Sequence, residues 1–427
     1  MLTEITHRLR NSQLFKDSFW AVFGNGLGNF LLLMAGILIA RLLGKDVYGE
    51  YGMVKTTMFH MAAFSTFGLS YTTTKFIAEF KSKDSSRLRS ITEASLTLSF
   101  VCSLVLSVLI FCFAEDLAQF INAPQLKPAF RFLSVITILR AISMTGAGLL
   151  AGYKSFKELG MNNIISGLVM VITAVPLTYF YGLFGSLSAL ALSQLVFALL
   201  NLYQIRIRLK SLVQQTKESF YRRLLTFSFP VAIQELSYTV SMWGSNLLIV
   251  KYASAGELGL YTASSQWYSI VLFLPSLLQN VVLSYLSGLV GNQTSHHYML
   301  RRMLLINFVC ALIPFLLVMA CSSMIVSFYG STFEGMQSVL VILIFATIPT
   351  TLSNVYVANF LAESRNWMLS ILRVSRDIIL LISLLLALTY TKGNHAALNC
   401  AIIHVGTAIF FLLALILSYM TKRKNQN

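Results

Sequence analysis

Twelve stretches of about 20 mostly apolar residues run through this chain, and they limit what it can fold into. A helix needs about 20 such residues to cross a bilayer, whereas a barrel strand needs about 10 of alternating polarity. The chain is 56% hydrophobic and 11% charged, against about 25% charged in a soluble domain. The sequence therefore predicts an all-α membrane protein with about 12 transmembrane helices. The stretches lie at roughly 18–40, 51–72, 90–113, 128–150, 160–181, 183–205, 224–250, 261–286, 303–324, 336–360, 367–390 and 395–419.

Lys and Arg residues gather in alternate connections between these stretches. The formal net charge is +16, from 32 basic and 16 acidic residues. Of the basic residues, 22 lie in the two tails and the connections on the same side, and 5 lie in the opposite connections. This asymmetry follows the positive-inside rule and places both termini in the cytoplasm. The positive charge is then a matter of orientation, and no nucleic-acid partner is expected.

A short segment of the chain is echoed 210 residues later. Arg41–Tyr51 and Lys251–Tyr261 each join two apolar stretches, begin with a basic residue and end in Gly-x-Tyr. A basic loop ends at Arg223, near the middle of the chain. Six apolar stretches precede this loop and six follow it, so both halves begin on the same side of the membrane. The sequence predicts a parallel internal repeat, with an N-terminal lobe at 1–210, a cytoplasmic loop at 211–223 and a C-terminal lobe at 224–427. Repeats of this kind are typical of transporters.

Three segments carry a resemblance to a known family. Ile37–Gly49 resembles the end of the first helix in the Wzx-like O-antigen and polysaccharide flippases of the MOP (multidrug/oligosaccharidyl-lipid/polysaccharide) exporter superfamily. Phe227–Pro230 resembles the opening of their seventh helix, and Gly259–Tyr261 the second-lobe counterpart of the first segment.

The resemblance implies a transporter and not an enzyme. Its substrate would be an undecaprenyl-diphosphate-linked oligosaccharide, an O-antigen repeat of lipopolysaccharide or a similar polysaccharide unit. The flippase would move it across the bacterial inner membrane by alternating access. The expected partners are this substrate, membrane lipids, a polysaccharide polymerase and a chain-length regulator.

The five remaining basic residues lie inside predicted spans, where each ionisable group costs about 2.5–3.5 kcal/mol. Arg140 is near the middle of the fourth span, too deep for its side chain to reach either interface. We expect Arg140, Arg376, Arg373 and Lys55 to form a cationic cavity that binds the anionic substrate. The alternatives are a structural ion pair for Arg140, and side chains that reach toward the interface for Arg373 and Lys55.

Two carboxylates, Glu235 and Asp377, lie about equally deep in the seventh and eleventh spans. One interpretation is a site that couples transport to H⁺ or Na⁺. The other is that Glu235 neutralises an arginine of the eleventh span, while Arg373 and Asp377 pair one turn apart.

Other polar residues allow two interpretations each. Asn25 and Asn29 share one face of the first span and can contact sugar hydroxyls or bond to a neighbouring helix. Gly24 and Gly28 share another face and favour close helix contact. His60 and His404 are expected to be packed, hydrogen-bonded histidines, with a proton relay as the alternative.

The sequence offers little for other functions. It has no nucleotide-binding loop and no metal-binding motif, so neither a cofactor nor a metal is expected. A drug or metabolite antiporter of the multidrug-efflux (MATE-like) branch remains the main alternative, although such a cavity should favour acidic residues. A membrane-embedded polysaccharide polymerase or ligase is less well supported, because the longest outer loop, Ala114–Lys127, has about 14 residues.

Overall fold

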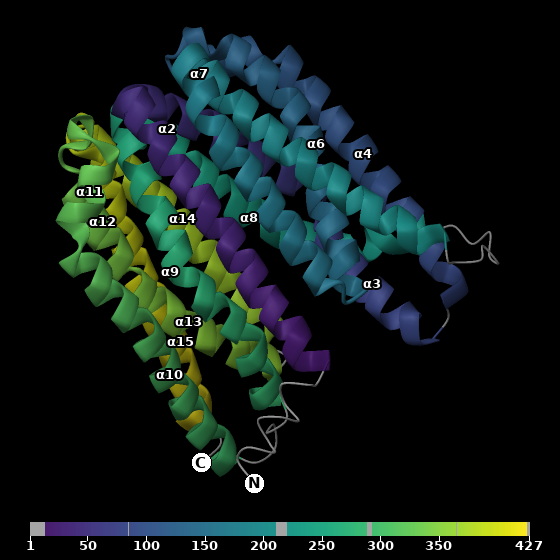
Figure 1. The fold of residues 1–427 in the computed structure, drawn as a ribbon. Helices are drawn as coiled ribbons and strands as arrows, with labels where there is room; N and C mark the ends of the chain where they lie inside the picture. The colour runs from purple at the N-terminus through teal and green to yellow at the C-terminus, as the bar shows by residue number, and fades with distance from the viewer. Residues whose placement is uncertain (1–12, 84, 211–219, 288–292, 364, 425–427) are drawn as a thin grey trace, which may run out of the picture. The chain divides into compact units, whose positions relative to one another are not determined.

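The computed structural model describes residues 13–83, 85–210, 220–287, 293–363 and 365–424 (Figure 1). Within these ranges the chain is helical and contains no strand. Seven stretches are long and apolar enough to cross a membrane, and two of them, of 44 and 55 residues, are long enough to cross it twice. With the further long helices described below, the prediction of an all-α protein with about twelve spans is confirmed.

The two longest helices each contain two predicted spans. α2 (Gln13–Ser65) bends at Gly44, which has φ 72° and ψ 167°. α7 (Phe156–Lys210) bends at Gly182, which has φ 53° and ψ −129°. Positive φ values are readily adopted by glycine, which has no Cβ. These glycines therefore allow the chain to turn between consecutive spans without a loop.

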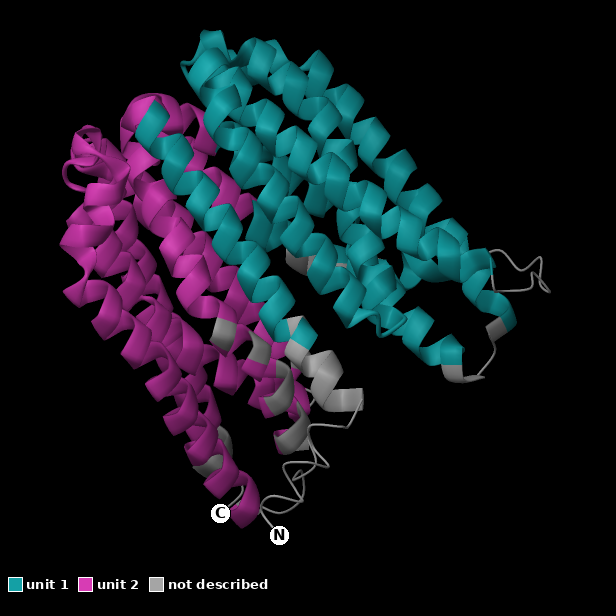
Figure 2. Cartoon of the chain, in the orientation of Figure 1, with its two compact units in different colours: residues 1–42, 53–239 teal, residues 43–52, 240–427 magenta. Residues whose placement is uncertain are grey.

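The chain divides into two compact units (Figure 2). Unit 1 comprises residues 1–42 and 53–239, and unit 2 comprises residues 43–52 and 240–427. The sequence placed the limit between lobes at 211–223, of which 211–219 lie outside the described residues. The division falls later because α8 (Tyr221–Tyr252) begins against unit 1, where the Ser228 and Thr72 hydroxyls are 2.7 Å apart.

In unit 1, α6 packs most extensively against α7, α4 and α3. The face of α4 toward α6 carries small hydroxyl side chains: Ser99 donates to the Ala141 carbonyl at 3.2 Å and Ser107 to the Ser134 carbonyl at 2.8 Å. Its opposite face exposes large apolar side chains such as Val105, at 57%. This arrangement is typical of a helix that faces lipid. The helices are α3 (Leu69–Lys83), α4 (Leu88–Cys112), α5 (Ala114–Phe120) and α6 (Lys127–Gly152), with 3-10 turns η1 (Ser85–Arg87) and η2 (Pro124–Leu126).

Unit 2 is built around α9, which packs against α12 and α13, while α14 packs against α15 (Figure 1). The tenth predicted span is divided between α12 and α13, which meet at Ala346. The helices are α9 (Ala255–Ser287), α10 (Gln293–Ala320), α11 (Ser322–Tyr329), α12 (Met336–Phe345), α13 (Thr347–Ala362), α14 (Asn366–Tyr390) and α15 (Ala396–Lys424), with the 3-10 turn η3 (Ser331–Phe333).

The two echoed segments pack against each other within unit 2. A Cβ added to Gly49 would lie 1.6 Å from the Ala255 carbonyl oxygen, and one added to Gly259 would lie 2.1 Å from the Lys45 carbonyl oxygen. Lys45 and Ala255 are themselves 210 residues apart, as are Gly49 and Gly259. The contact is therefore reciprocal, as between two copies related by a two-fold axis.

Candidate functional site

In unit 1, Arg140 lies on α6 between an amide and an aromatic ring. Its Nη1 donates a long hydrogen bond to Gln194 Oε1 of α7, at 3.4 Å. Its guanidinium carbon is 4.4 Å from the centroid of the Phe59 ring of α2. None of the described carboxylates forms an ion pair with Arg140, and its buried Nε has no hydrogen-bond partner in the described chain. The site can therefore accept an anion.

A line of buried polar groups continues from Gln194. The Ser143 hydroxyl donates to the Leu139 carbonyl at 2.8 Å and lies 3.4 Å from the Gln194 carbonyl. The Asn201 amide donates to the Ser143 carbonyl at 3.4 Å, and Asn162 donates to the Asn201 side chain at 2.9 Å. These residues join α6 to both halves of α7.

Lys55 lies on α2, the helix that also carries the Phe59 ring in contact with Arg140. Lys55 and Phe59 are four residues apart on α2, so they share one helix face. The Lys55 side chain is half-buried. The assignment of Lys55 to one cationic cavity with Arg140 stays a prediction.

The two predicted asparagines differ in their surroundings. Asn163 of α7 donates a hydrogen bond to the Asn25 side-chain oxygen, which favours the helix-bonding interpretation for Asn25. Asn29 is exposed. Nearby, a Cβ on Gly24 would lie only 2.4 Å from the Gly160 Cα. The predicted close helix contact at Gly24 is confirmed.

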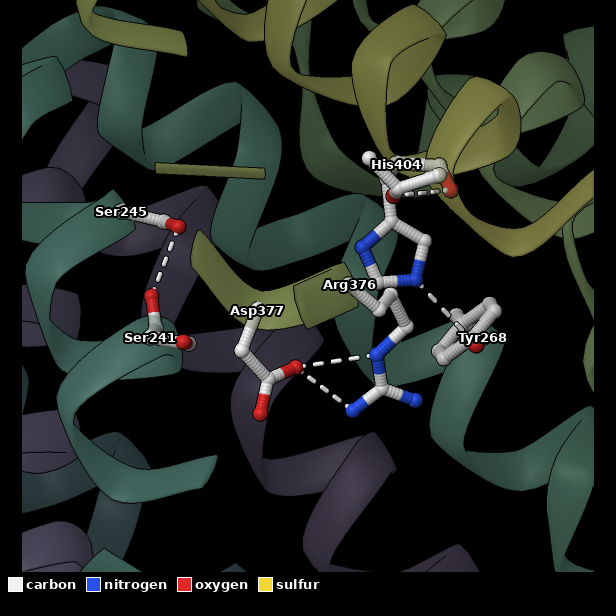
Figure 3. Close-up of polar contacts among 7 residues, drawn as sticks. Ser241, Ser245, Tyr268, Arg376, Asp377 and His404 are labelled. Carbon is white, nitrogen blue, oxygen red and sulfur yellow. Dashed lines mark hydrogen bonds and ion pairs between the residues drawn. The ribbon is translucent and has the colours of Figure 1, made fainter. Parts of the chain in front are cut away.

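In unit 2, Arg376 pairs with the carboxylate that follows it on α14. Its Nε and Nη2 donate to Asp377 Oδ1 at 2.9 and 2.6 Å, and its guanidinium carbon is 5.0 Å from the centroid of the Phe411 ring. The Arg376 side chain is 26% exposed, whereas that of Asp377 is 4% exposed. Figure 3 shows the guanidinium turned toward the carboxylate. This cation is therefore partly neutralised by its neighbour.

A second polar group in unit 2 joins three helices. His404 Nε2 of α15 is 3.3 Å from the Tyr268 hydroxyl of α9 (Figure 3). The Tyr268 hydroxyl is 3.2 Å from the Thr350 hydroxyl of α13. The expectation of a hydrogen-bonded histidine at position 404 is confirmed.

The remaining predicted residues are less fully placed. Arg373 is half-buried on α14, one turn before Asp377. Glu235 lies on α8 within unit 1, and its side chain falls outside the described residues. Asp377 lies in unit 2, and a coupling site formed by these two carboxylates stays a prediction.

Sequence reasoning missed Phe59, Gln194, Tyr268 and Thr350 as members of these polar groups. The 210-residue repeat could have indicated two of them, Gln194 and Thr350. Thr350 follows Arg140 by 210 residues, and His404 follows Gln194 by the same interval. The bonded pair Arg140–Gln194 of unit 1 thus corresponds to Thr350 and His404 of unit 2, which Tyr268 joins. One position of the repeat is polar in both units, but it is cationic in unit 1 alone.

Comparison with known proteins gives a family for most of the chain. Residues 38–306 match the model of a family described as polysaccharide biosynthesis protein.

Curated relatives match at low identity. The chain is 23% identical over 264 residues to an uncharacterised membrane protein of Methanocaldococcus jannaschii, with 59% of this chain and 62% of that protein covered. It is 24% identical over 280 residues to stage V sporulation protein B of Bacillus subtilis, covering 59% of this chain and 54% of that one. It is 19% identical over 304 residues to a putative O-antigen transporter of Shigella flexneri, covering 70% and 72%. The chain thus matches less than two thirds of the length of the first two.

Solved structures match nearly the whole chain. An inward-facing multidrug resistance MATE family transporter of the MOP superfamily has a TM-score of 0.80 at 15% identity, covering 94% of this chain and 96% of that one. The lipid II flippase MurJ, in an inward closed conformation, has a TM-score of 0.74 at 15% identity, covering 95% and 87%. At this identity the likeness shows the fold, which is that of a multi-pass MOP-type transporter.

Proposed function

Because the chain belongs to the polysaccharide biosynthesis protein family, we propose that it is a flippase for a lipid-linked oligosaccharide. The cargo is an undecaprenyl-diphosphate-linked repeat unit of O-antigen or a similar polysaccharide. The name of the Shigella flexneri relative, an O-antigen transporter, and the MurJ fold, that of a lipid II flippase, support this proposal.

Arg140 is the observation that carries the proposal. A cation inside a span is retained when it pairs or faces a polar path, and no described carboxylate pairs with Arg140. A guanidinium presents a planar fork of donors that suits phosphate oxygens. Arg140 therefore binds the diphosphate. Lys55 adds positive charge on the same side of Phe59, and Arg376 and Arg373 supply cations in unit 2.

The substrate divides chemically into three parts. Its diphosphate is held by arginine, and its sugar hydroxyls contact neutral polar groups such as the exposed Asn29. Its polyprenyl tail stays in the hydrocarbon of the bilayer, where burial of each CH₂ gains about 0.8 kcal/mol. Alternating access then moves the polar part from the cytoplasmic to the outer leaflet, without covalent chemistry and without a cofactor.

The proposed transport includes a coupling ion, a membrane location and partner proteins. Glu235 and Asp377 are the candidates for coupling to H⁺ or Na⁺, since carboxylates inside membrane spans suit either ion. The charge asymmetry of the loops supports a location in the bacterial inner membrane with both termini cytoplasmic. A polysaccharide polymerase and a chain-length regulator are the expected partners on the product side.

A drug or metabolite antiporter is the second candidate, because the MATE transporter has a TM-score of 0.80. Such a transporter would be expected to favour acidic groups, because its usual substrates are cations. Arg140 has no described acid beside it, and Asp377 is already engaged by Arg376. The charge of the two sites favours an anionic cargo.

Replacement of Arg140 tests the proposed function. In cells whose surface polysaccharide depends on this protein, Arg140→Gln should strongly reduce the polysaccharide while the protein stays in the membrane. Loss of a charged hydrogen bond costs about 1.5–3 kcal/mol, or roughly 10- to 100-fold in affinity. The measurement is surface polysaccharide per membrane-inserted protein.

Arg131→Gln is the matched control on the same helix. Arg131 is exposed, and its guanidinium lies 5.2 Å from the Phe111 ring. This variant should export normally. Full export by a well-expressed Arg140→Gln variant would contradict the proposal.

A further inference from the structure

A cluster of aromatic rings joins α3 to the beginning of α8 in unit 1. The Phe76 and Phe227 ring centroids are 5.5 Å apart, and those of Phe80 and Phe220 are 5.7 Å apart. The later residue of α3 faces the earlier one of the α8 segment, so the two helices run antiparallel here. The rings of Phe76 and Phe80 are buried, and that of Phe227 is 39% exposed. They form a rigid support for whatever lies on them.

Two cations lie over these rings. The Lys75 Nζ is 3.7 Å from the Phe227 centroid and 5.2 Å from that of Phe76. The Arg223 guanidinium carbon is 5.4 Å from the Phe76 centroid and 5.3 Å from that of Phe80. These distances are within the range of cation–π attraction. The exposed cations Lys75 and Arg223 therefore both lie near the ring of Phe76.

The ion pairs of the described chain do not include either cation, Lys75 or Arg223. The first turn of α8 contains no acidic residue. The amino-terminal end of a helix adds partial positive charge. Arg87 brings a third cation, 5.7 Å from the Phe80 centroid. An anion placed among these groups would relieve their mutual repulsion.

Exposed apolar side chains lie one turn away from each cation. Tyr71, 66% exposed, precedes Lys75 by four residues on α3, and Phe227 follows Arg223 by four residues on α8. Each pair shares a helix face. Because the helices are antiparallel, both apolar side chains lie on the same side of the cations. A ligand with a charged head and an apolar tail matches this order, whereas a soluble phosphate would use the cations alone.

We propose that Lys75 and Arg223, held over the Phe76 ring, bind the headgroup of an anionic phospholipid whose acyl chain runs along Tyr71 and Phe227. The loop asymmetry places this end of unit 1 at the cytoplasmic leaflet, where anionic lipids attract basic residues. The site is separate from Arg140 and does not depend on the transported substrate. It is a resident lipid site that anchors the junction of α3 and α8.

Lipid binding to the purified full-length protein tests this site. The protein in neutral detergent micelles is titrated with dioleoyl-phosphatidylglycerol or dioleoyl-phosphatidylcholine, and bound lipid is counted by native mass spectrometry. The wild type should retain phosphatidylglycerol in preference to phosphatidylcholine. Lys75→Gln with Arg223→Gln should weaken this binding by about tenfold or more, since each basic residue near an anionic lipid contributes attraction. Higher salt should weaken the wild-type binding in the same direction.

Arg222→Gln is the matched control, because Arg222 is an exposed neighbour on the same helix turn. It should bind phosphatidylglycerol as the wild type does. If the double variant cannot be purified, each single variant should show a partial loss, and Lys75→Arg should retain binding. Equal binding by the wild type and the substituted variants would overturn the proposal. Retention of undecaprenyl diphosphate but not of phosphatidylglycerol would also overturn it, by assigning the site to the substrate.

Discussion

At the scale of single residues, two arginines lie over aromatic rings but differ in their acid partners. Arg140 lies over Phe59 without a described carboxylate, whereas Arg376 lies over Phe411 and donates twice to Asp377. A guanidinium over a ring is attracted by the ring face and is more weakly hydrated than an ammonium. The Phe59 ring stabilises the Arg140 cation inside the membrane span. Because no described carboxylate pairs with Arg140, its guanidinium is available to an anionic ligand.

The Arg376–Asp377 pair gives a stability prediction. Asp377→Asn leaves the Arg376 charge without its partner, and such a loss costs up to about 3–5 kcal/mol for a fully buried pair. Asp377→Asn and Arg376→Gln should each lower the thermal unfolding temperature in detergent. The double variant should lose less than the sum of the two. Additive losses would show that the two side chains do not stabilise each other.

The residues were predictable from the sequence to different degrees. Arg140 stood out because a charge at mid-span is costly, and its depth was enough to select it. The Arg376–Asp377 bond was not foreseen, because helix spacing favours partners three or four residues apart, and here the partner is the adjacent residue. Gln194 and Phe59 carry no charge, so only the fold could bring them to Arg140.

At the scale of elements, the echoed segments show why glycine recurs in the repeat. Gly49 and Gly259 allow the part of α2 that follows the Gly44 bend and the beginning of α9 to approach until backbone touches backbone. The order of the spans was predictable from hydropathy, since each span is a long apolar run. The joining of two spans in α2 and in α7, and the division of the tenth span between α12 and α13, were not. The position of the division within α8 was not, because it depends on which residues α8 packs against.

Gly49→Ala tests this close contact. Its Cβ would lie 1.6 Å from the Ala255 carbonyl oxygen, so the helices must separate. Overpacking of this kind costs about 1–3 kcal/mol, and the unfolding temperature should fall. Gly406→Ala on α15 is the control, because nothing lies within 4 Å of a Cβ there. It should be neutral or slightly stabilising, since alanine favours helix by about 1 kcal/mol over glycine. Equal stability of both variants would refute the packing argument.

At the scale of the whole molecule, the two halves of the chain share a helical arrangement but differ in the charge of corresponding side chains. The pair Arg140 and Gln194 recurs 210 residues later as Thr350 and His404, so the same place in each half is polar while only the first is cationic. A symmetric ancestor would present two alike sites. The asymmetric charge suits a substrate with one anionic group and a larger neutral part, as in a diphosphate joined to an oligosaccharide.

Transport by the purified protein tests this account most directly. The wild type and the Arg140→Gln variant are reconstituted in liposomes with an undecaprenyl-diphosphate-linked oligosaccharide, and the sugar that reaches the opposite leaflet is measured with an impermeant glycosidase. The wild type should transfer the substrate, and Arg140→Gln should do so roughly 10- to 100-fold more slowly, by the cost of a charged hydrogen bond. Transport of a cationic drug by the wild type, with no transfer of the lipid-linked sugar, would contradict the account.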